Sequence, residues 1–234
     1  MNSITKLFLE ALKASLHGQS LSWDKVCTGN DLQQILELSS RQMLLPMIYE
    51  SIRQCPDWQI LPPQVDLQIR MSVVRAAAQQ AAGTQRFLKL YEEMREIGLT
   101  PLVVKGIVCR NLYPNPDERI SSDEDLYVSE EQLGRIRDFL MGNGFIYEDE
   151  GKPEEHMNEF TYRRKDGLYL EVHRRLFSKD SSAYGDWERF FSHAHERKTK
   201  IRIQNTDLYS MNETDHFFYL ICHAYNVNFQ RFYN

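Results

Sequence analysis

The feature that most constrains the fold is a change of pattern at Pro101. Upstream of it, apolar residues recur at the spacing of amphipathic helices. One such series advances alternately by four and three residues: Leu67, Met71, Val74, Ala78 and Ala81. Downstream, short apolar runs of strand length are separated by turn residues, beginning with residues 102–104 between Pro101 and Gly106. The sequence therefore predicts a helical region followed by an α+β core.

We expect three regions: a helical N-terminal region at 1–98, the core at 99–211, and the start of a helical C-terminal region at 212–234. Asn212 and Asp215 open the last predicted helix, which has no stop signal before the sequence ends. We therefore expect the chain to be part of a longer protein. The apolar stripe predicted for this helix contains Phe217, Leu220, Ile221, Ala224 and Val227.

Composition narrows the class of function. A net charge of −5 gives no support for a nucleic-acid binder, whose affinity depends on clustered Lys and Arg. The four cysteines are widely spaced, which is typical of thiols in a reducing compartment and not of a disulfide framework or zinc site. The sequence has no signal-peptide pattern and no apolar run of roughly 18 residues. We expect a cytoplasmic protein with no membrane contact and no indicated nucleic-acid partner.

Paired carboxylates give the strongest indication of chemistry. Asp123 and Asp125 lie in a predicted strand at 123–128, where side chains of alternate residues share a face. Two neighbouring carboxylates repel each other unless a cation lies between them, and oxygen ligands of this kind suit Mg²⁺ or Mn²⁺. Glu171, in a predicted hairpin strand at 168–173, shares its face with His173. The sequence therefore predicts an acidic metal site.

A D-x-D pair alone is weak evidence in a chain with 33 acidic residues, because such pairs are common on solvated surfaces. Two basic features strengthen it. Lys105 and Gly106 lie at a predicted strand-to-helix turn, where backbone N–H groups and a lysine can receive phosphate oxygens. Arg119 precedes the pair and could neutralise a triphosphate, although it could equally pair with Asp123. Lys105 and His173 also have purely structural interpretations.

Three motifs occur in a fixed order: V-V-K-G at 103–106, Y-P-N-P-D-E-R-I-S-S-D-E-D-L-Y-V at 113–128, and L-E-V-H-R-R-L at 170–176. This set resembles an uncharacterised nucleotidyltransferase family of the polymerase-β-like superfamily, over roughly residues 40–234. The resemblance implies an α+β fold with a small mixed sheet and helices on one side. It also implies that the acids bind two metal ions.

Carried over by position, the resemblance makes Asp123 and Asp125 the metal-bridging pair and Glu171 the third metal ligand. Together these three form the expected catalytic set, with Glu171 also a candidate base for the acceptor. The nucleotide-binding residues expected from it are Lys105, Gly106, Arg119, Ser122 and His173. Two positions depart from the superfamily pattern: Ile107 replaces a second Gly or Ser, and Glu124 replaces an apolar residue.

The resemblance implies transfer of a nucleoside monophosphate from a Mg²⁺- or Mn²⁺-bound nucleoside triphosphate, such as ATP, to an unknown acceptor hydroxyl, with release of pyrophosphate. One alternative is a glycosyltransferase that uses its D-x-D pair to hold a nucleotide sugar. The other is a non-catalytic module whose N-terminal helices bind a protein partner. The altered glycine turn favours the second alternative.

Overall fold

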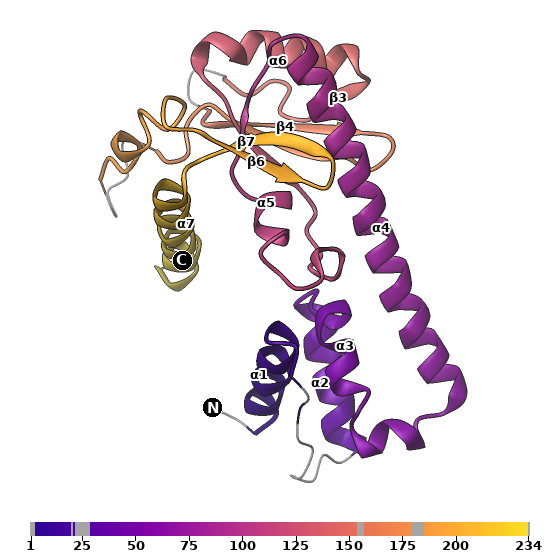
Figure 1. Ribbon diagram of the computed structural model, residues 1–234. Coiled ribbons are helices and arrows are strands. Elements are labelled where there is room, and N and C mark those ends of the chain that lie inside the picture. Colours follow the sequence, from indigo (N-terminus) through magenta and orange to yellow (C-terminus); the bar gives the residue numbers. More distant parts are fainter. Residues whose placement is uncertain (1–2, 20, 22–28, 154–156, 179–184, 234) are drawn as a thin grey trace. The chain divides into compact units, whose positions relative to one another are not determined.

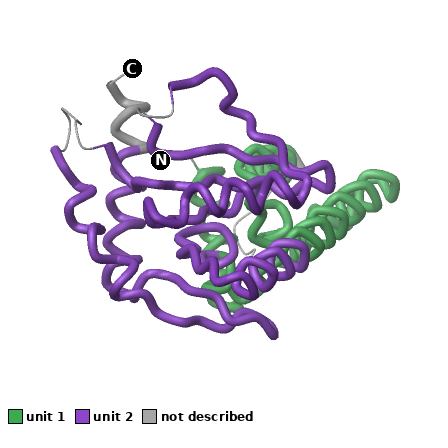
Figure 2. The backbone as a smooth tube through the Cα atoms, turned by 90° about the horizontal axis from the view of Figure 1, so that it is seen from above, with its two compact units in different colours: residues 1–84, 110–121 green, residues 85–109, 122–234 purple. Residues whose placement is uncertain are grey.

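The computed structural model describes residues 3–19, 21, 29–153, 157–178 and 185–233 of the chain (Figure 1). It divides into two compact units: unit 1 comprises residues 1–84 and 110–121, and unit 2 comprises residues 85–109 and 122–234 (Figure 2). The three-region division expected from the sequence stays a prediction. In the described part of the chain, no helix combines the length and apolar character needed to cross a membrane.

Unit 1 is helical. Its elements are α1 (Ser3–Leu16), α2 (Gly29–Arg41), α3 (Leu45–Ile52), η1 (Pro56–Ile60), the first part of α4 (Pro63–Glu96) and η2 (Pro116–Glu118). Pro46 lies in the first turn of α3, where its missing N–H is not needed. Leu32, Ile35 and Ile48 are fully buried in the core that these helices share.

The apolar stripe predicted on α4 is not the buried face of that helix. Leu67, Met71 and Val74 are exposed, while Val73, Gln80 and Thr84 are buried. Polar contacts account for part of this orientation, since the Gln80 side-chain oxygen accepts a hydrogen bond from the backbone N–H of Ser121 at 2.9 Å. Apolar periodicity therefore identified the helix but selected the wrong face.

Unit 2 is built on a seven-stranded mixed sheet with the order β3-β4-β5-β2-β1-β7-β6. The strands are β1 (Leu102–Val103), β2 (Glu124–Tyr127), β3 (Phe145–Tyr147), β4 (Glu159–Arg164), β5 (Tyr169–His173), β6 (Thr199–Ile203) and β7 (Thr206–Ser210). The remaining elements are α5 (Ile107–Arg110), α6 (Glu130–Gly142), η4 (Glu188–Phe190) and α7 (Glu213–Tyr233). Two strand pairs are parallel, β2 with β5 and β1 with β7. The expected α+β class with a mixed sheet is confirmed.

The two faces of the sheet carry separate apolar cores. On one face, Leu126 and Leu170 pack with residues of α6 and of the last turns of α4. On the other, Leu102 and Tyr127 pack with residues of α7 and of the segment around Phe191. Figure 1 shows α6 and α7 on opposite sides of the strands.

Of the face predicted to be buried on α7, Leu220 packs against the core, but other residues do not. Phe217 is 68% exposed and Ile221 is 51% exposed, whereas Tyr219 and Cys222 are buried against the sheet. The side chain of Val227 lies outside the described residues. Both sides of this helix are apolar, so hydrophobic periodicity alone could not identify the inward side.

Candidate functional site

Parallel pairing of β2 with β5 assembles the candidate site. Asp125 lies opposite Glu171 in this register, and Tyr127 lies opposite His173. The pairing continues past the strand end, where the backbone N–H of Val128 donates to the carbonyl of His173 at 2.9 Å. Because side chains alternate along a strand, Asp125, Glu171 and His173 all project from the α7 side of the sheet.

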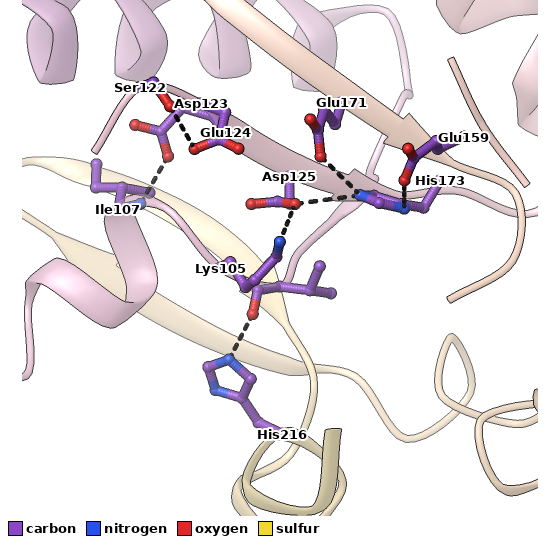
Figure 3. A network of polar contacts seen from close by, with 11 residues as sticks. Lys105, Ile107, Ser122, Asp123, Glu124, Asp125, Glu159, Glu171, His173 and His216 are labelled. Atoms are coloured by element: carbon purple, nitrogen blue, oxygen red, sulfur yellow. Dashed lines mark hydrogen bonds and ion pairs between the residues drawn. The ribbon is translucent and has the colours of Figure 1, made fainter. Parts of the chain in front are cut away.

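Asp125 is the centre of the polar network in Figure 3. Its carboxylate is 1% exposed and accepts an ion-pair contact from Lys105 Nζ at 2.8 Å and a contact from His173 Nε2 at 3.1 Å. Burial opposes ionisation of Asp125, but the His173 hydrogen bond and the Lys105 charge outweigh it and lower the pKa of Asp125. Burial likewise opposes charge on Lys105, yet the adjacent Asp125 carboxylate leaves the pKa of Lys105 raised. Asp125 is therefore held as an anion.

His173 joins three carboxylates. Its Nε2 lies 3.1 Å from Asp125 Oδ1 and 3.8 Å from Glu171 Oε2, and its Nδ1 lies 3.5 Å from Glu159 Oε2. One ligand atom each from Asp125, Glu171 and His173 falls within 4.8 Å of the others. Two carboxylate oxygens and an imidazole nitrogen at this separation can share one divalent cation.

Glu171 is an acid of the group whose pKa is shifted upward. Its pKa is raised to about 7, first by burial and then by the negative charges of Asp125, Glu159 and Asp123. A carboxyl with this pKa is partly protonated at neutral pH and can accept or release a proton there. Glu171 therefore combines the properties of a cation ligand and of a base.

Asp123 lies one residue before β2, so strand alternation does not place it. Its Oδ1 accepts a hydrogen bond from Ser122 Oγ at 3.3 Å (Figure 3). Among the described residues, the group that meets within 4.8 Å does not include Asp123. Its charge nevertheless contributes to the raised pKa values of Lys105 and Glu171, which shows that it acts on the same site.

In the glycine turn, a backbone N–H group that could bind phosphate is already hydrogen-bonded within the protein. Gly106 adopts φ of +51°, in the left-handed region that favours glycine. The next backbone N–H, that of Ile107, donates to Glu124 Oε2 at 2.6 Å. A Cβ added at Gly106 would overlap the Glu124 carboxylate. Glu124, the polar residue between the two aspartates, is therefore paired with the glycine turn.

Arg119 belongs to unit 1, and its guanidinium carbon lies 5.8 Å from the centre of the Tyr113 ring, also in unit 1. This is a cation–π contact. The expected contact of Arg119 with a triphosphate stays a prediction.

Helix α7 contributes groups that sequence reasoning did not assign to the site. His216 Nε2 donates to the carbonyl of Val104 at 2.6 Å and so fixes the backbone just before Lys105 (Figure 3). Tyr219 is 2% exposed, and its ring lies 5.8 Å from that of His223. Burial lowers the pKa of His223, and the positive charge of Lys105 lowers it further. The seven-residue spacing of His216 and His223 is visible in the sequence. Nothing in the sequence indicates that the helix carrying them contacts the segment of Lys105.

The geometry thus joins a buried, ionised aspartate, a glutamate that titrates near neutrality, an imidazole and a lysine on one face of a mixed sheet. No curated protein and no solved structure matches the chain. The model of one family, described as "Uncharacterised nucleotidyltransferase", matches residues 28–233, which is most of the sequence. The resemblance inferred from the ordered motifs is confirmed, and the chain belongs to this uncharacterised nucleotidyltransferase family.

Proposed function

We propose that the chain is an enzyme that transfers a nucleoside monophosphate from a nucleoside triphosphate to an acceptor hydroxyl, with release of pyrophosphate. The observation that carries the proposal is the convergence of Asp125, Glu171 and His173, whose ligand atoms lie within 4.8 Å of one another. The charge of Asp123 acts on the same place. Family membership supplies the class of reaction.

The donor set fits a divalent cation, because two carboxylates crowded together gain most from a bound positive charge. Asp125 and Glu171 would hold the ion, and Asp123 would add its negative charge to the site. When bound, Mg²⁺ or Mn²⁺ supplies Lewis-acid stabilisation of the negative charge that develops on phosphoryl oxygens.

The chain's own residues have distinct tasks in this proposal. Glu171, whose pKa is about 7 when no cation is bound, would accept the proton of the acceptor hydroxyl. Lys105, whose raised pKa keeps it cationic, pairs with phosphate oxygens of the triphosphate. His216, through Val104, fixes the backbone that carries Lys105.

Calorimetry with a non-hydrolysable ATP analogue and Mn²⁺ or Mg²⁺ tests the proposal. We expect cation-dependent binding that weakens at least about tenfold in the near-isosteric variants Asp125→Asn and Glu171→Gln, since metal-site changes of this kind commonly cost 10- to 100-fold. Asp207→Asn is the matched control, because Asp207 pairs with Lys200 in the β6–β7 hairpin and not with the site. Unchanged binding in Asp125→Asn would refute the proposed site.

A second candidate is a non-catalytic module, and two contacts favour it. The Lys105 ammonium already neutralises Asp125 at 2.8 Å, and the Ile107 N–H is already bonded to Glu124 at 2.6 Å. This candidate predicts no nucleotide binding with either cation by the folded chain. The variant Lys105→Met distinguishes the enzyme from the non-catalytic module. It should weaken nucleotide binding if the chain is an enzyme, and should only lower stability if the chain is a non-catalytic module. Preference for a nucleotide sugar over ATP would instead support the glycosyltransferase alternative.

A further inference from the structure

The family resemblance predicts that His173 binds nucleotide, but its position among the acids fits a different role. It is the last residue of β5, its side chain is 7% exposed, and it lies opposite Tyr127 in the register. Its Nε2 is directed between two acids, 3.1 Å from Asp125 and 3.8 Å from Glu171. An imidazole nitrogen in this place is at ligand distance from any cation that both acids hold.

The other ring nitrogen supplies an independent observation. Glu159, on the neighbouring strand β4, pairs with His173 across the antiparallel register. Its Oε2 lies 3.5 Å from His173 Nδ1. Histidines that bind metals generally have a carboxylate or carbonyl on their second nitrogen, which fixes the ring orientation and leaves the first nitrogen free to bind. Glu159 lies where such a carboxylate would lie, at ion-pair distance from Nδ1, and Asp125 with Glu171 lies on the Nε2 side.

We propose that His173 is a direct metal ligand through Nε2, so that Asp125, Glu171 and His173 form a mixed oxygen–nitrogen site that prefers Mn²⁺ to Mg²⁺. The inference rests on the proposed function, because it concerns the cation of that same site. Mg²⁺ favours an all-oxygen environment and keeps several of its waters, whereas Mn²⁺ binds imidazole more readily. An all-carboxylate set would show a smaller preference for Mn²⁺.

Cation binding changes the contacts that the Asp125 carboxylate makes. In the absence of a cation, Lys105 and His173 both contact Asp125 Oδ1. A cation binds Nε2 in the tautomer whose ring proton is on Nδ1 beside Glu159, so the proton that Nε2 shares with Asp125 in the absence of a cation moves through water to Nδ1. Lys105 then loses part of its hold on Asp125 and becomes available to an anionic oxygen.

Pulsed electron paramagnetic resonance of the chain loaded with Mn²⁺ alone tests the proposal directly. A coordinated imidazole gives ¹⁴N coupling to the Mn²⁺ electron spin, and labelling the protein with ¹⁵N-histidine must change that coupling. We expect the coupling in the wild type and its loss in His173→Gln, with Mn²⁺ affinity reduced about 10- to 100-fold. Affinity for Mg²⁺ should change much less, so the preference for Mn²⁺ over Mg²⁺ should fall.

Two further variants sharpen the test. Glu159→Gln should weaken Mn²⁺ binding without removing the nitrogen coupling, because it changes only the partner of Nδ1. His193→Gln is the histidine control, since His193 is exposed and pairs with Glu196. Mn²⁺ bound without ¹⁴N coupling in the wild type would overturn this inference and leave the proposed function standing. Absence of Mn²⁺ binding by the folded chain would overturn both.

Discussion

Replacing Gly106 with alanine should destabilise unit 2 far more than an ordinary glycine substitution. The left-handed φ of +51° costs an alanine about 1–2 kcal/mol. The new Cβ would also overlap the Glu124 carboxylate and lie 2.9 Å from the carbonyl oxygen of Asp123. Displacing Glu124 breaks its buried, charge-assisted bond to the Ile107 N–H, which is worth about 1.5–3 kcal/mol. The sum is about 2.5–5 kcal/mol.

Urea denaturation followed by circular dichroism measures this loss, and amide exchange of β2 shows that it arises in unit 2. Gly144→Ala is the matched control, because Gly144 has φ of +78° and no heavy atom within 4 Å of a built Cβ. That control carries the backbone strain alone and should lose about 1–2 kcal/mol.

A double-mutant cycle isolates the steric part of the effect. In a Glu124→Ala background the carboxylate is absent, so Gly106→Ala should cost less than it does in the wild type. The Asp123 carbonyl oxygen, 2.9 Å from the built Cβ, should still keep the cost above that of Gly144→Ala. Equal losses for Gly106→Ala and Gly144→Ala in the wild-type background would refute the reasoning. So would strict additivity of Gly106→Ala and Glu124→Ala.

Two further predictions concern buried polar groups. The pKa of Glu171 is 4.5 when unperturbed and about 7 in the folded chain, so the stability that it contributes is complete below pH 4.5 and is lost as pH rises through 7. Glu171→Gln should therefore raise the free energy of unfolding at pH 8 without divalent cations by up to about 3 kcal/mol, and by little at pH 4.5, as urea titrations at both pH values can show. The Tyr91 hydroxyl donates to the Pro101 carbonyl at 2.7 Å and accepts from the Tyr209 N–H at 3.0 Å, so Tyr91→Phe should cost about 1–3 kcal/mol by the same measurement. A loss below about 0.5 kcal/mol would contradict that account.

The strands that carry the site could be predicted because their local signals are strong. The apolar run at 102–104 contains two β-branched valines and is bounded by Pro101 and Gly106. The hairpin of β4 and β5 turns at Asp166-Gly167, where Gly167 adopts φ of +93°. Strand alternation also placed Glu171 and His173 on one face, as the register shows. These features depend on local sequence patterns, so they can be predicted without knowing which strands pair.

Other features depend on tertiary structure and were not predictable. Strand β7 was missed because its turn from β6 uses Gln204 at φ of +53°, with no Gly or Pro to mark it. Asp123 was expected to share the face of Asp125, but β2 begins at Glu124. The contact of α7 with Val104 joins residues 112 positions apart, which no local pattern encodes. The roles assigned to the site residues stay predictions.

The position of β2 and β5 within the sheet has a consequence for how the site withstands fluctuation. They are adjacent inner strands, with β3 and β4 beyond one of them and β1, β7 and β6 beyond the other. Edge strands fray first, so local openings of β3 or β6 leave the backbone beneath Asp125 and Glu171 hydrogen-bonded on both sides. The acidic residues are consequently kept in register through local openings of the sheet edges, so that a ligand meets a prearranged surface.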